Sequence, residues 1–181
     1  MARLTAMRVL AFAASNSSVS INRKLVEYAA SLVDFADIET LDIHDYEMPI
    51  YRLDREIADG VPQLAHDFLA RIGAVDALII SFAENNKTYS AAFKNLFDWC
   101  SRAQSDVWQG KRMVLLSTSP GRSGADQVLG FAVEWAPKFG GEVVGYLSVP
   151  SFNHTFDKAE AKLIDQDLDR QLRTLVAKLA R

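Results

Sequence analysis

Five of the six residues at positions 15–20 are serine or asparagine, whose hydroxyl and amide groups can bind anions. They come immediately before an apolar pattern typical of a helix, and the free N–H groups and dipole of a helix N-terminus attract negative charge. Neutral donors could therefore hold a phosphate dianion at this point. A helix cap within a turn is the alternative interpretation, but a cap requires only one such residue. The residues that we expect to contact the phosphate are Ser15, Ser17, Ser20, Ile21 and Asn22.

Two further polar segments follow apolar runs in the same way. Residues 83–89 read Ala-Glu-Asn-Asn-Lys-Thr-Tyr and offer donors and acceptors for a planar heterocycle. Residues 117–124 read Ser-Thr-Ser-Pro-Gly-Arg-Ser-Gly, a glycine-containing turn where the backbone can approach a ligand closely. Either segment alone could be an ordinary turn. The candidate binding residues in them are Ala83, Glu84, Asn85, Asn86, Ser119 and Gly121.

The residues that several other kinds of binding site require are missing from the sequence. The first polar segment has no glycine, so the Gly-x-Gly-x-x-Gly pattern of dinucleotide-binding domains is absent. Gly110-Lys111 resembles the end of a P-loop, but Ser105 stands at the earlier glycine position and the pair precedes a strand. The single Cys100 excludes an internal disulfide and a multi-thiolate metal site. We expect no metal, no nucleophilic side chain, a buried thiol, and exposed imidazoles at His44, His66 and His154.

The apolar pattern that must position these segments alternates between short β-rich runs and helical stretches. The expected strands are Val9–Ala13, Ile38–Ile43, Ala77–Phe82, Met113–Ser117 and Val143–Val149. The expected helices are Ile21–Phe35, a helix from Pro62 through Ile72, Ser90–Ser101, Ala125 to near Pro137, and Lys158–Leu179. This alternation predicts an α/β three-layer sandwich with a parallel sheet, in which ligands bind beyond the carboxyl ends of the strands. The one long irregular segment, His44–Gly60, is expected to be an ordered crossover or interface loop.

Length and charge limit the remaining possibilities. The chain has 181 residues, and we expect residues 1–181 to form one domain. Its 20 basic and 23 acidic residues give a net charge of −3, which argues against nucleic-acid binding. No apolar run approaches the roughly 18 residues of a membrane span. Val9–Ala14 imitates a signal peptide with its Ala-Phe-Ala, but six residues fall short of the roughly 7–15 required, so we expect a buried strand in a cytoplasmic protein.

The polar segments resemble the NADPH-dependent FMN reductase family, flavodoxin-like proteins that include quinone, azo-dye and chromate reductases. The family's first loop reads Gly-Ser-x-Arg-x-x-Ser-x-Asn, where this chain has Ala14, Ser15, Ser17, Ser20 and Asn22 at the five specified positions. The family's second loop, Pro-Glu-Tyr-Asn, corresponds to residues 83–86, which read Ala-Glu-Asn-Asn. Its following helix, Leu-Lys-Asn-x-x-Asp-Trp, corresponds to residues 93–99, which read Phe-Lys-Asn-Leu-Phe-Asp-Trp, the most specific match. The third loop, Ser-x-Gly-x-x-Gly, is matched at Ser119, Gly121 and Gly124.

The resemblance covers nearly the whole chain and implies a flavodoxin-like sheet of five parallel strands in the order 2-1-3-4-5. It implies an FMN whose phosphate lies in the first loop and whose isoalloxazine ring lies against the second. NADPH or NADH would reduce the flavin by hydride transfer, and quinones, free flavin or similar oxidants would then collect two electrons in a ping-pong reaction. The flavin carries this chemistry, so no side chain is expected to be catalytic. A homodimer or homotetramer is also implied, with Trp108, Phe152 and Phe156 either at its interface or in the core.

Two other functions stay open. A one-electron carrier resembling flavodoxin would dock to partner proteins, but such carriers are strongly acidic and a net charge of −3 gives weak steering. The second open function is that of a scaffold or regulatory module that has kept the fold and lost the flavin, because fold alone does not establish function. The family's loop arginine, proline and tyrosine are replaced here by Ser17, Ala83 and Asn85.

Overall fold

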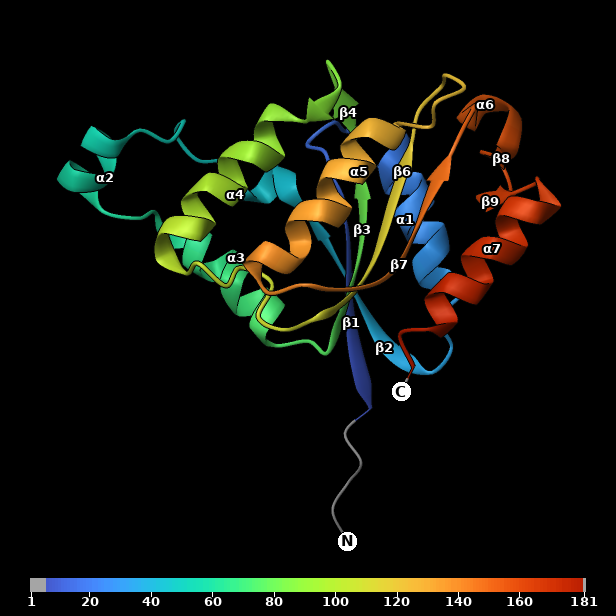
Figure 1. Ribbon diagram of the computed structural model, residues 1–181, viewed down its shortest axis with the longest axis horizontal. Helices are drawn as coiled ribbons and strands as arrows, with labels where there is room; N and C mark the ends of the chain where they lie inside the picture. Colours follow the sequence, from blue (N-terminus) through green and yellow to red (C-terminus); the bar gives the residue numbers. More distant parts are fainter. Residues whose placement is uncertain (1–5, 181) are drawn as a thin grey trace, which may run out of the picture.

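The computed structural model describes residues 6–180, and a five-stranded parallel sheet forms its centre (Figure 1). The strands are β1 (Met7–Ala14), β2 (Ala36–Asp42), β3 (Ala77–Phe82), β6 (Arg112–Thr118) and β7 (Glu142–Val149). Their order in the sheet is β2-β1-β3-β6-β7, which confirms the predicted flavodoxin-like order. In the register of the three middle strands, Phe12 lies beside Ile80 and Ile80 beside Leu115.

Helices cover both faces of the sheet, which confirms the three-layer arrangement (Figure 1). On one face lie α1 (Ile21–Ser31) and α7 (Gln166–Ala177), and on the other lie α3 (Gln63–Gly73), α4 (Ala91–Ala103) and α5 (Asp126–Trp135). Alternate residues of β1 point to opposite faces, as the pleat of a strand requires. Leu10 and Phe12 belong to the core beneath α3, α4 and α5, whereas Val9 and Ala11 belong to the core beneath α1 and α7. The apolar run at Val9–Ala14 is therefore a buried strand, as predicted.

Several predicted boundaries are wrong because short elements interrupt the long patterns. The helix expected to reach Phe35 ends at Ser31, and the helix expected from Lys158 begins only at Gln166, where the carboxylate of Asp165 caps it. Residues before that cap form a hairpin of β8 (Phe156–Asp157) and β9 (Lys162–Leu163), preceded by α6 (Phe152–Thr155). The segment expected to be irregular contains a 3₁₀ helix, η1 (Ile43–Tyr46), and α2 (Leu53–Asp59); a second 3₁₀ helix, η2 (Ala136–Phe139), follows α5.

The aromatic residues considered for an interface belong to the core. Trp108, Phe152 and Phe156 are at most 3% exposed. Phe152 stacks on Phe156 with ring centroids 4.6 Å apart, and Trp108 packs against Phe97 at 5.6 Å. Their side chains are therefore not available to a partner, and the interface alternative for them is wrong. No helix within residues 6–180 has the length and apolarity needed to cross a bilayer.

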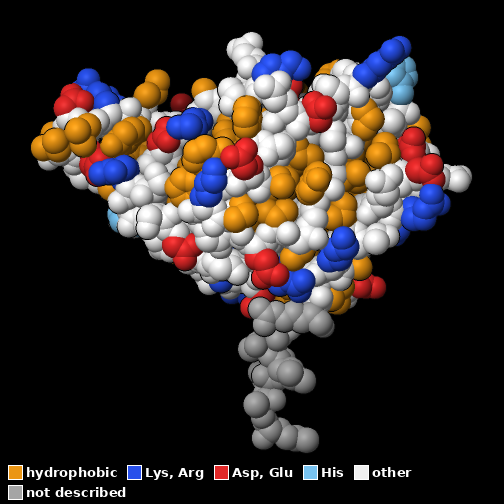
Figure 2. All heavy atoms as spheres, viewed as in Figure 1, with side chains coloured by type: hydrophobic (Ala, Val, Ile, Leu, Met, Phe, Trp, Pro, Cys, Tyr) orange, Lys and Arg blue, Asp and Glu red, His pale blue; other side chains and the backbone are white. Residues whose placement is uncertain are grey.

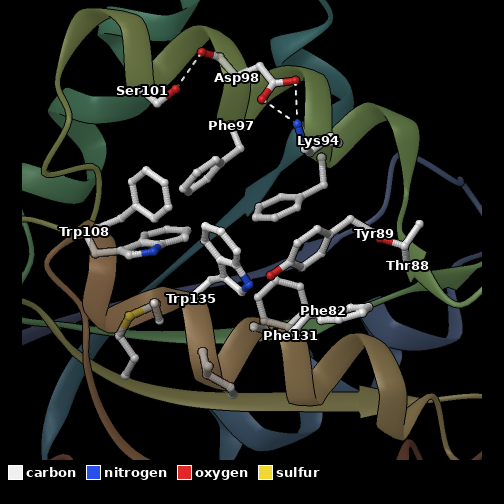
Figure 3. A pocket seen from close by; sticks show the side chains of 16 residues that line it. Phe82, Thr88, Tyr89, Lys94, Phe97, Asp98, Ser101, Trp108, Phe131 and Trp135 are labelled. Carbon is white, nitrogen blue, oxygen red and sulfur yellow. Dashed lines mark hydrogen bonds and ion pairs between the residues drawn. The ribbon is translucent and has the colours of Figure 1, made fainter.

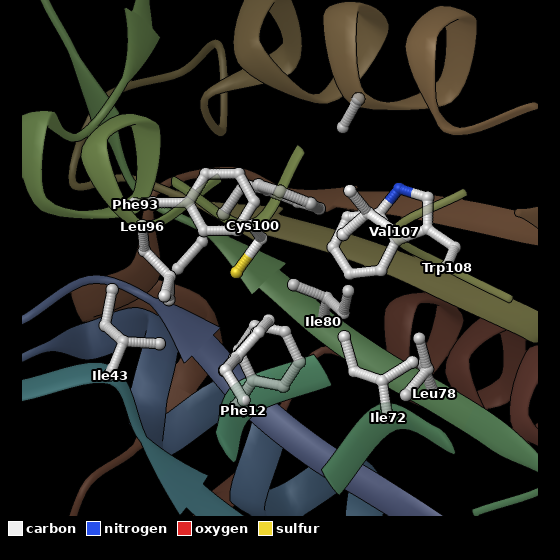
Figure 4. Packing of buried hydrophobic residues seen from close by; sticks show 14 of the residues in the cluster. Phe12, Ile43, Ile72, Leu78, Ile80, Phe93, Leu96, Cys100, Val107 and Trp108 are labelled. Atoms are coloured by element: carbon white, nitrogen blue, oxygen red, sulfur yellow. The ribbon is translucent and has the colours of Figure 1, made fainter. Parts of the chain in front are cut away.

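Interlocking aromatic rings hold the core beneath α3 and α4 together. Phe68 of α3 makes edge-to-face contacts with Phe12 at 5.6 Å and with Tyr46 at 5.4 Å, and it is 1% exposed. Figure 4 shows the neighbouring part of this core, in which Phe12, Ile80 and Cys100 pack within one cluster. Edge-to-face aromatic pairs stabilise a core beyond their burial.

Replacing Phe68 by alanine should lower the free energy of unfolding by about 3–5 kcal/mol, because the cavity cannot be refilled by neighbours that themselves pack on the lost ring. His66 lies exposed on the same helix, and His66→Ala should change the free energy of unfolding by less than about 0.5 kcal/mol. Urea denaturation followed by circular dichroism measures both. Equal effects for the two variants would contradict the packing described.

Candidate functional site

Three loops leave the carboxyl ends of adjacent strands, where an open parallel sheet binds ligands. The first loop (residues 15–20) follows β1, the second (residues 83–90) follows β3, and the third (residues 119–125) follows β6. Direct hydrogen bonds join them. The hydroxyl of Ser90, which begins α4, donates to the carbonyl of Ala14 at 2.9 Å. The predicted site residues therefore meet along one edge of the sheet.

The first loop forms the N-terminus of α1. Ser20 caps the helix, with its Oγ accepting from the N–H of Arg23 at 3.2 Å, and Ser15 and Ser17 likewise accept main-chain N–H groups within the loop. Each of these hydroxyls keeps its own proton to donate. Within residues 6–180, the main-chain N–H groups of Ile21 and Asn22 donate to no protein acceptor. Two free N–H groups and three serine hydroxyls thus lie at, or in the loop just before, one helix N-terminus, which is an anion-binding arrangement.

Asn22 has a different role from the one its position suggested. Its side chain is 3% exposed, and the Oδ1 atom accepts from the hydroxyl of Ser81 at 2.8 Å and from the N–H of Thr118 at 3.0 Å. The Nδ2 atom donates to the carbonyl of Thr118 at 3.2 Å. The amide therefore ties α1 to the ends of β3 and β6, and only the main chain of Asn22 is free for a ligand. Ser81 was missed, although a polar residue at the end of an apolar strand is a visible signal. Thr118 lies in the third polar segment but was not among the candidate residues.

The second loop is a small hairpin of β4 (Glu84–Asn85) and β5 (Thr88–Tyr89), which the sequence did not predict. The two residues at its tip, Asn86 and Lys87, have φ values of +51° and +70°, the backbone of a two-residue hairpin turn that usually contains glycine. Ala83 is half-buried, and the side chains of Asn85 and Asn86 are exposed.

The carboxylate of Glu84 is held by another element. Its Oε2 accepts from the N–H of Val128 at 3.1 Å, in the first turn of α5, and its Oε1 lies 3.4 Å from the ammonium of Lys87. Ala125, which precedes α5, supplies no side-chain cap, so Glu84 provides this stabilisation from a distant part of the chain. Glu84 therefore fixes the second loop against the helix that follows the third.

The third loop is braced by the segment after β7. The carbonyl of Ser119 accepts from the N–H of Phe152 at 3.1 Å, and the carbonyl of Gly121 accepts from the N–H of Ser151 at 2.9 Å. Gly124 has a φ of +60°, and a Cβ there would lie 2.3 Å from the Oγ of Ser148. Glycine is thus required for the close approach of this loop to β7. Gly121 is exposed on the loop, beside the half-buried Ser119.

The thiol and the imidazoles lie where the sequence predicted. Cys100 is fully buried, and burial raises the pKa of its thiol to about 12, so the reactive thiolate is not formed at neutral pH. His44, His66 and His154 are exposed. Among residues 6–180, no group of histidine, cysteine, aspartate and glutamate side chains is arranged to hold a metal ion.

A cavity of about 440 Å³ lies beside these loops, between α4 and α5 (Figure 3). Phe82 and Tyr89 of the second loop region form one end, and Trp135 of α5 lies further along its wall. Burial raises the pKa of Tyr89 to about 12, so its hydroxyl stays protonated. The sequence did not predict this cavity. Half of the residues that line it are aromatic, which sets it apart from the polar first loop.

Comparisons with known proteins show what this chain is similar to. A family model described as NADPH-dependent FMN reductase matches residues 7–154. A probable NADPH:quinone oxidoreductase 2 of Oryza sativa subsp. japonica is 30% identical over 124 residues, covering 66% of this chain and 60% of that protein. An NADPH:quinone oxidoreductase of Arabidopsis thaliana is 30% identical over 122 residues, covering 65% of this chain and 61% of that protein. The matching region thus spans about 60% of the length of these curated relatives.

Solved structures show the same fold over nearly the whole chain. A flavoenzyme NAD(P)H:(acceptor) oxidoreductase from Paracoccus denitrificans has a TM-score of 0.75 at 24% identity, covering 96% of this chain and 94% of its own. An FMN-dependent NADH-azoreductase from Bacillus anthracis, in complex with FMN, has a TM-score of 0.69 at 13% identity, covering 96% of this chain and all of its own. Since the family model matches residues 7–154, most of the chain with all three loops, the chain belongs to the NADPH-dependent FMN reductase family.

Proposed function

We propose that this protein is an FMN-dependent NAD(P)H oxidoreductase that passes two electrons to a quinone, free flavin or a similar small-molecule acceptor. The observation that carries the proposal is the N-terminus of α1, where the free N–H groups of Ile21 and Asn22 meet three serine hydroxyls. The names of the plant relatives, which are NADPH:quinone oxidoreductases, support the choice of co-substrate and acceptor.

The residues of the first loop fit a phosphate group. Residues 14–22 include no aspartate or glutamate, so no side-chain carboxylate within this segment would repel a dianion. We assign the phosphate of FMN to Ser15, Ser17, Ser20 and the main chain of Ile21 and Asn22. Serine replaces the family's arginine at position 17, and binding through neutral donors needs no cation at that position.

The second and third loops are proposed to hold the ring of FMN. Ala83, Glu84, Asn85 and Asn86 would lie against it, with Ser119 and Gly121 on the third loop. The Glu84 carboxylate already bonds to α5, so its negative charge is partly compensated there. The exposed amides of Asn85 and Asn86 remain free to bond to a polar ring edge.

When bound, FMN supplies the redox chemistry, taking up a hydride from NADPH or NADH and passing two electrons to the acceptor. The part of the protein is to bind and orient both substrates, and we assign no catalytic role to a side chain. Cys100 is excluded as a nucleophile by its burial. We also propose that the protein works as a homodimer or homotetramer in the cytoplasm, a reducing compartment that suits its lone thiol.

The phosphate assignment predicts that Ser20→Ala weakens FMN binding by about tenfold or more while riboflavin, which lacks the phosphate, is little affected. A hydrogen bond to a charged group contributes about 1.5–3 kcal/mol. Asp165→Ala is the matched control, because it also removes a helix cap but lies outside the three loops. Titration of flavin fluorescence measures both affinities. Equal losses of FMN and riboflavin would show that Ser20 acts only as the cap of α1.

The reaction proposed here predicts ping-pong kinetics. If nicotinamide nucleotide and acceptor use the same space in turn, plots of reciprocal rate against reciprocal NADPH concentration at several quinone concentrations should be parallel. Rapid mixing of the FMN-loaded protein with NADPH alone should bleach the flavin absorbance. Converging lines would contradict the alternate binding of nucleotide and acceptor in one space. A flavin that NADPH and NADH both fail to reduce would favour a one-electron carrier, and no flavin binding would favour a regulatory module.

A further inference from the structure

The cavity between α4 and α5, here named the aromatic cavity, extends from the surface into the core. Met113 and Leu115 of β6 and Phe82 at the end of β3 line it and are buried. Phe131 and Trp135 of α5 also line it and are 37% and 46% exposed, so the cavity opens to solvent beside α5. Figure 2 shows hydrophobic side chains gathered on this face, over α4 and α5. The volume of about 440 Å³ lies within the range of about 300–1,000 Å³ that is typical of small-molecule sites.

Three polar atoms in this lining have no hydrogen-bond acceptor within residues 6–180. They are the hydroxyl of Tyr89 and the indole nitrogens of Trp108 and Trp135. By contrast, the indole N–H of Trp99, on the neighbouring face of α4, donates to the carbonyl of Pro49 at 2.7 Å. Figure 3 shows the hydroxyl of Tyr89 and the nitrogen of Trp135 turned toward the middle of the cavity. The lining therefore offers donors that the protein itself does not use.

Trp108 is the most informative of the three, because it is only 3% exposed. Within residues 6–180, every fully shielded side-chain nitrogen or oxygen has a hydrogen-bond partner. The Nε1 atom of Trp108 has none, so it borders open space, and the aromatic cavity is the space that Trp108 lines. A buried indole N–H usually has a partner, because an unpaired buried donor costs free energy. Trp108 thus directs an unused donor into an almost entirely apolar environment.

The chemistry of the donors limits what they can bind. An indole N–H donates and cannot accept. Burial raises the pKa of Tyr89 to about 12, so its hydroxyl also keeps a proton to donate. A molecule that pairs with these groups must carry an acceptor, and a carbonyl oxygen is the simplest acceptor on an otherwise apolar molecule.

The charges around the cavity favour a neutral molecule. The ammonium of Lys94 bonds to the carboxylate of Asp98 at 2.6 Å, so both charges are already paired. The ammonium of Lys138 lies 4.1 Å from the centre of the Trp135 ring, where it would repel a cation. The faces of aromatic rings carry partial negative charge and disfavour an anion.

The rings of the lining favour a flat molecule. Phe97 packs edge to face on Phe139, with ring centroids 4.8 Å apart. Trp135 lies nearly parallel to Phe139, with centroids 6.3 Å apart and 26° between the ring planes. Aromatic rings attract one another in offset-stacked and edge-to-face arrangements, so an aromatic guest can form both kinds of contact with this lining.

We propose that the aromatic cavity is a second ligand site, which binds a flat, neutral aromatic molecule whose carbonyl oxygen accepts a hydrogen bond from the indole N–H of Trp108. The hydroxyl of Tyr89 and the indole of Trp135 supply further donors nearer the opening. The inference goes beyond the proposed function and does not depend on it, because none of the residues assigned to FMN lines the aromatic cavity.

The compound 1-indanone is a suitable probe, because it is flat, neutral and aromatic and has one carbonyl group. Indane, which has the same two fused rings without the carbonyl, is the matched control compound. Equilibrium dialysis against the FMN-saturated protein measures both affinities. We expect one 1-indanone bound per chain. Trp108→Phe should weaken 1-indanone about three- to tenfold more than indane, because a hydrogen bond between neutral groups contributes about this factor.

A second variant tests where the probe binds and stays informative if Trp108→Phe does not fold. Ala132 of α5 is buried and lines the cavity, so Ala132→Leu places three additional carbon atoms in the space for the ligand. It should weaken both compounds at least about tenfold. Ala177→Leu is the matched control, because Ala177 is exposed on α7, on the other side of the sheet. Circular dichroism checks that each variant is folded.

Failure of 1-indanone to bind the wild type would overturn the proposal. Binding that Ala132→Leu leaves unchanged would place the probe elsewhere and overturn it equally. Equal losses of 1-indanone and indane in folded Trp108→Phe would refute the role of the indole N–H. A protein that binds 1-indanone in this way but takes up no FMN would contradict only the proposed function.

Discussion

The side-chain amide of Asn22 is the contact on which the site depends. It lies in the first turn of α1 and bonds with both of its polar atoms to the ends of two other strands, β3 and β6. Burying an amide costs free energy unless its polar atoms form hydrogen bonds, so the orientation of the Asn22 side chain allows little variation. The N–H groups beside it are thereby aimed beyond the carboxyl edge of the sheet. The Ser90 bond to Ala14 and the Glu84 bond to Val128 extend the same framework to the second and third loops.

The helix α4 carries the motif of residues 93–99, whose polar side chains make contacts on two different sides of the helix. Asn95 and Trp99 donate hydrogen bonds to the carbonyls of Met48 and Pro49, before α2. Lys94 and Asp98 pair with each other and line the cavity between α4 and α5. The motif was the strongest sign of the family, yet its side chains make their contacts away from the phosphate loop. Its Phe93, Leu96 and Trp99 are buried in the core beneath α4.

The strands and their order were predictable because buried parallel strands are continuous apolar runs, and the first loop was predictable because serine and asparagine exceed what a cap needs. The direction of a side chain was not predictable. Asn22 sits in a polar segment, but whether its amide turns outward to a ligand or inward to Ser81 depends on strands distant in the sequence. The tip of the second loop lacks glycine, so Asn86 and Lys87 gave no hairpin signal. The sequence did not predict the helix α2, because two large aliphatic residues among its seven are too few to form a recognisable amphipathic pattern.

The carboxylate of Glu84 also couples two distant regions mechanically. It accepts a hydrogen bond from the N–H of Val128 in the first turn of α5, and the later turns of that helix carry Phe131 and Trp135. A helix moves as a nearly rigid rod over these three turns, so a shift of the hairpin at one end displaces the aromatic rings at the other. Loop conformation and the shape of the outer surface therefore do not vary independently in this protein.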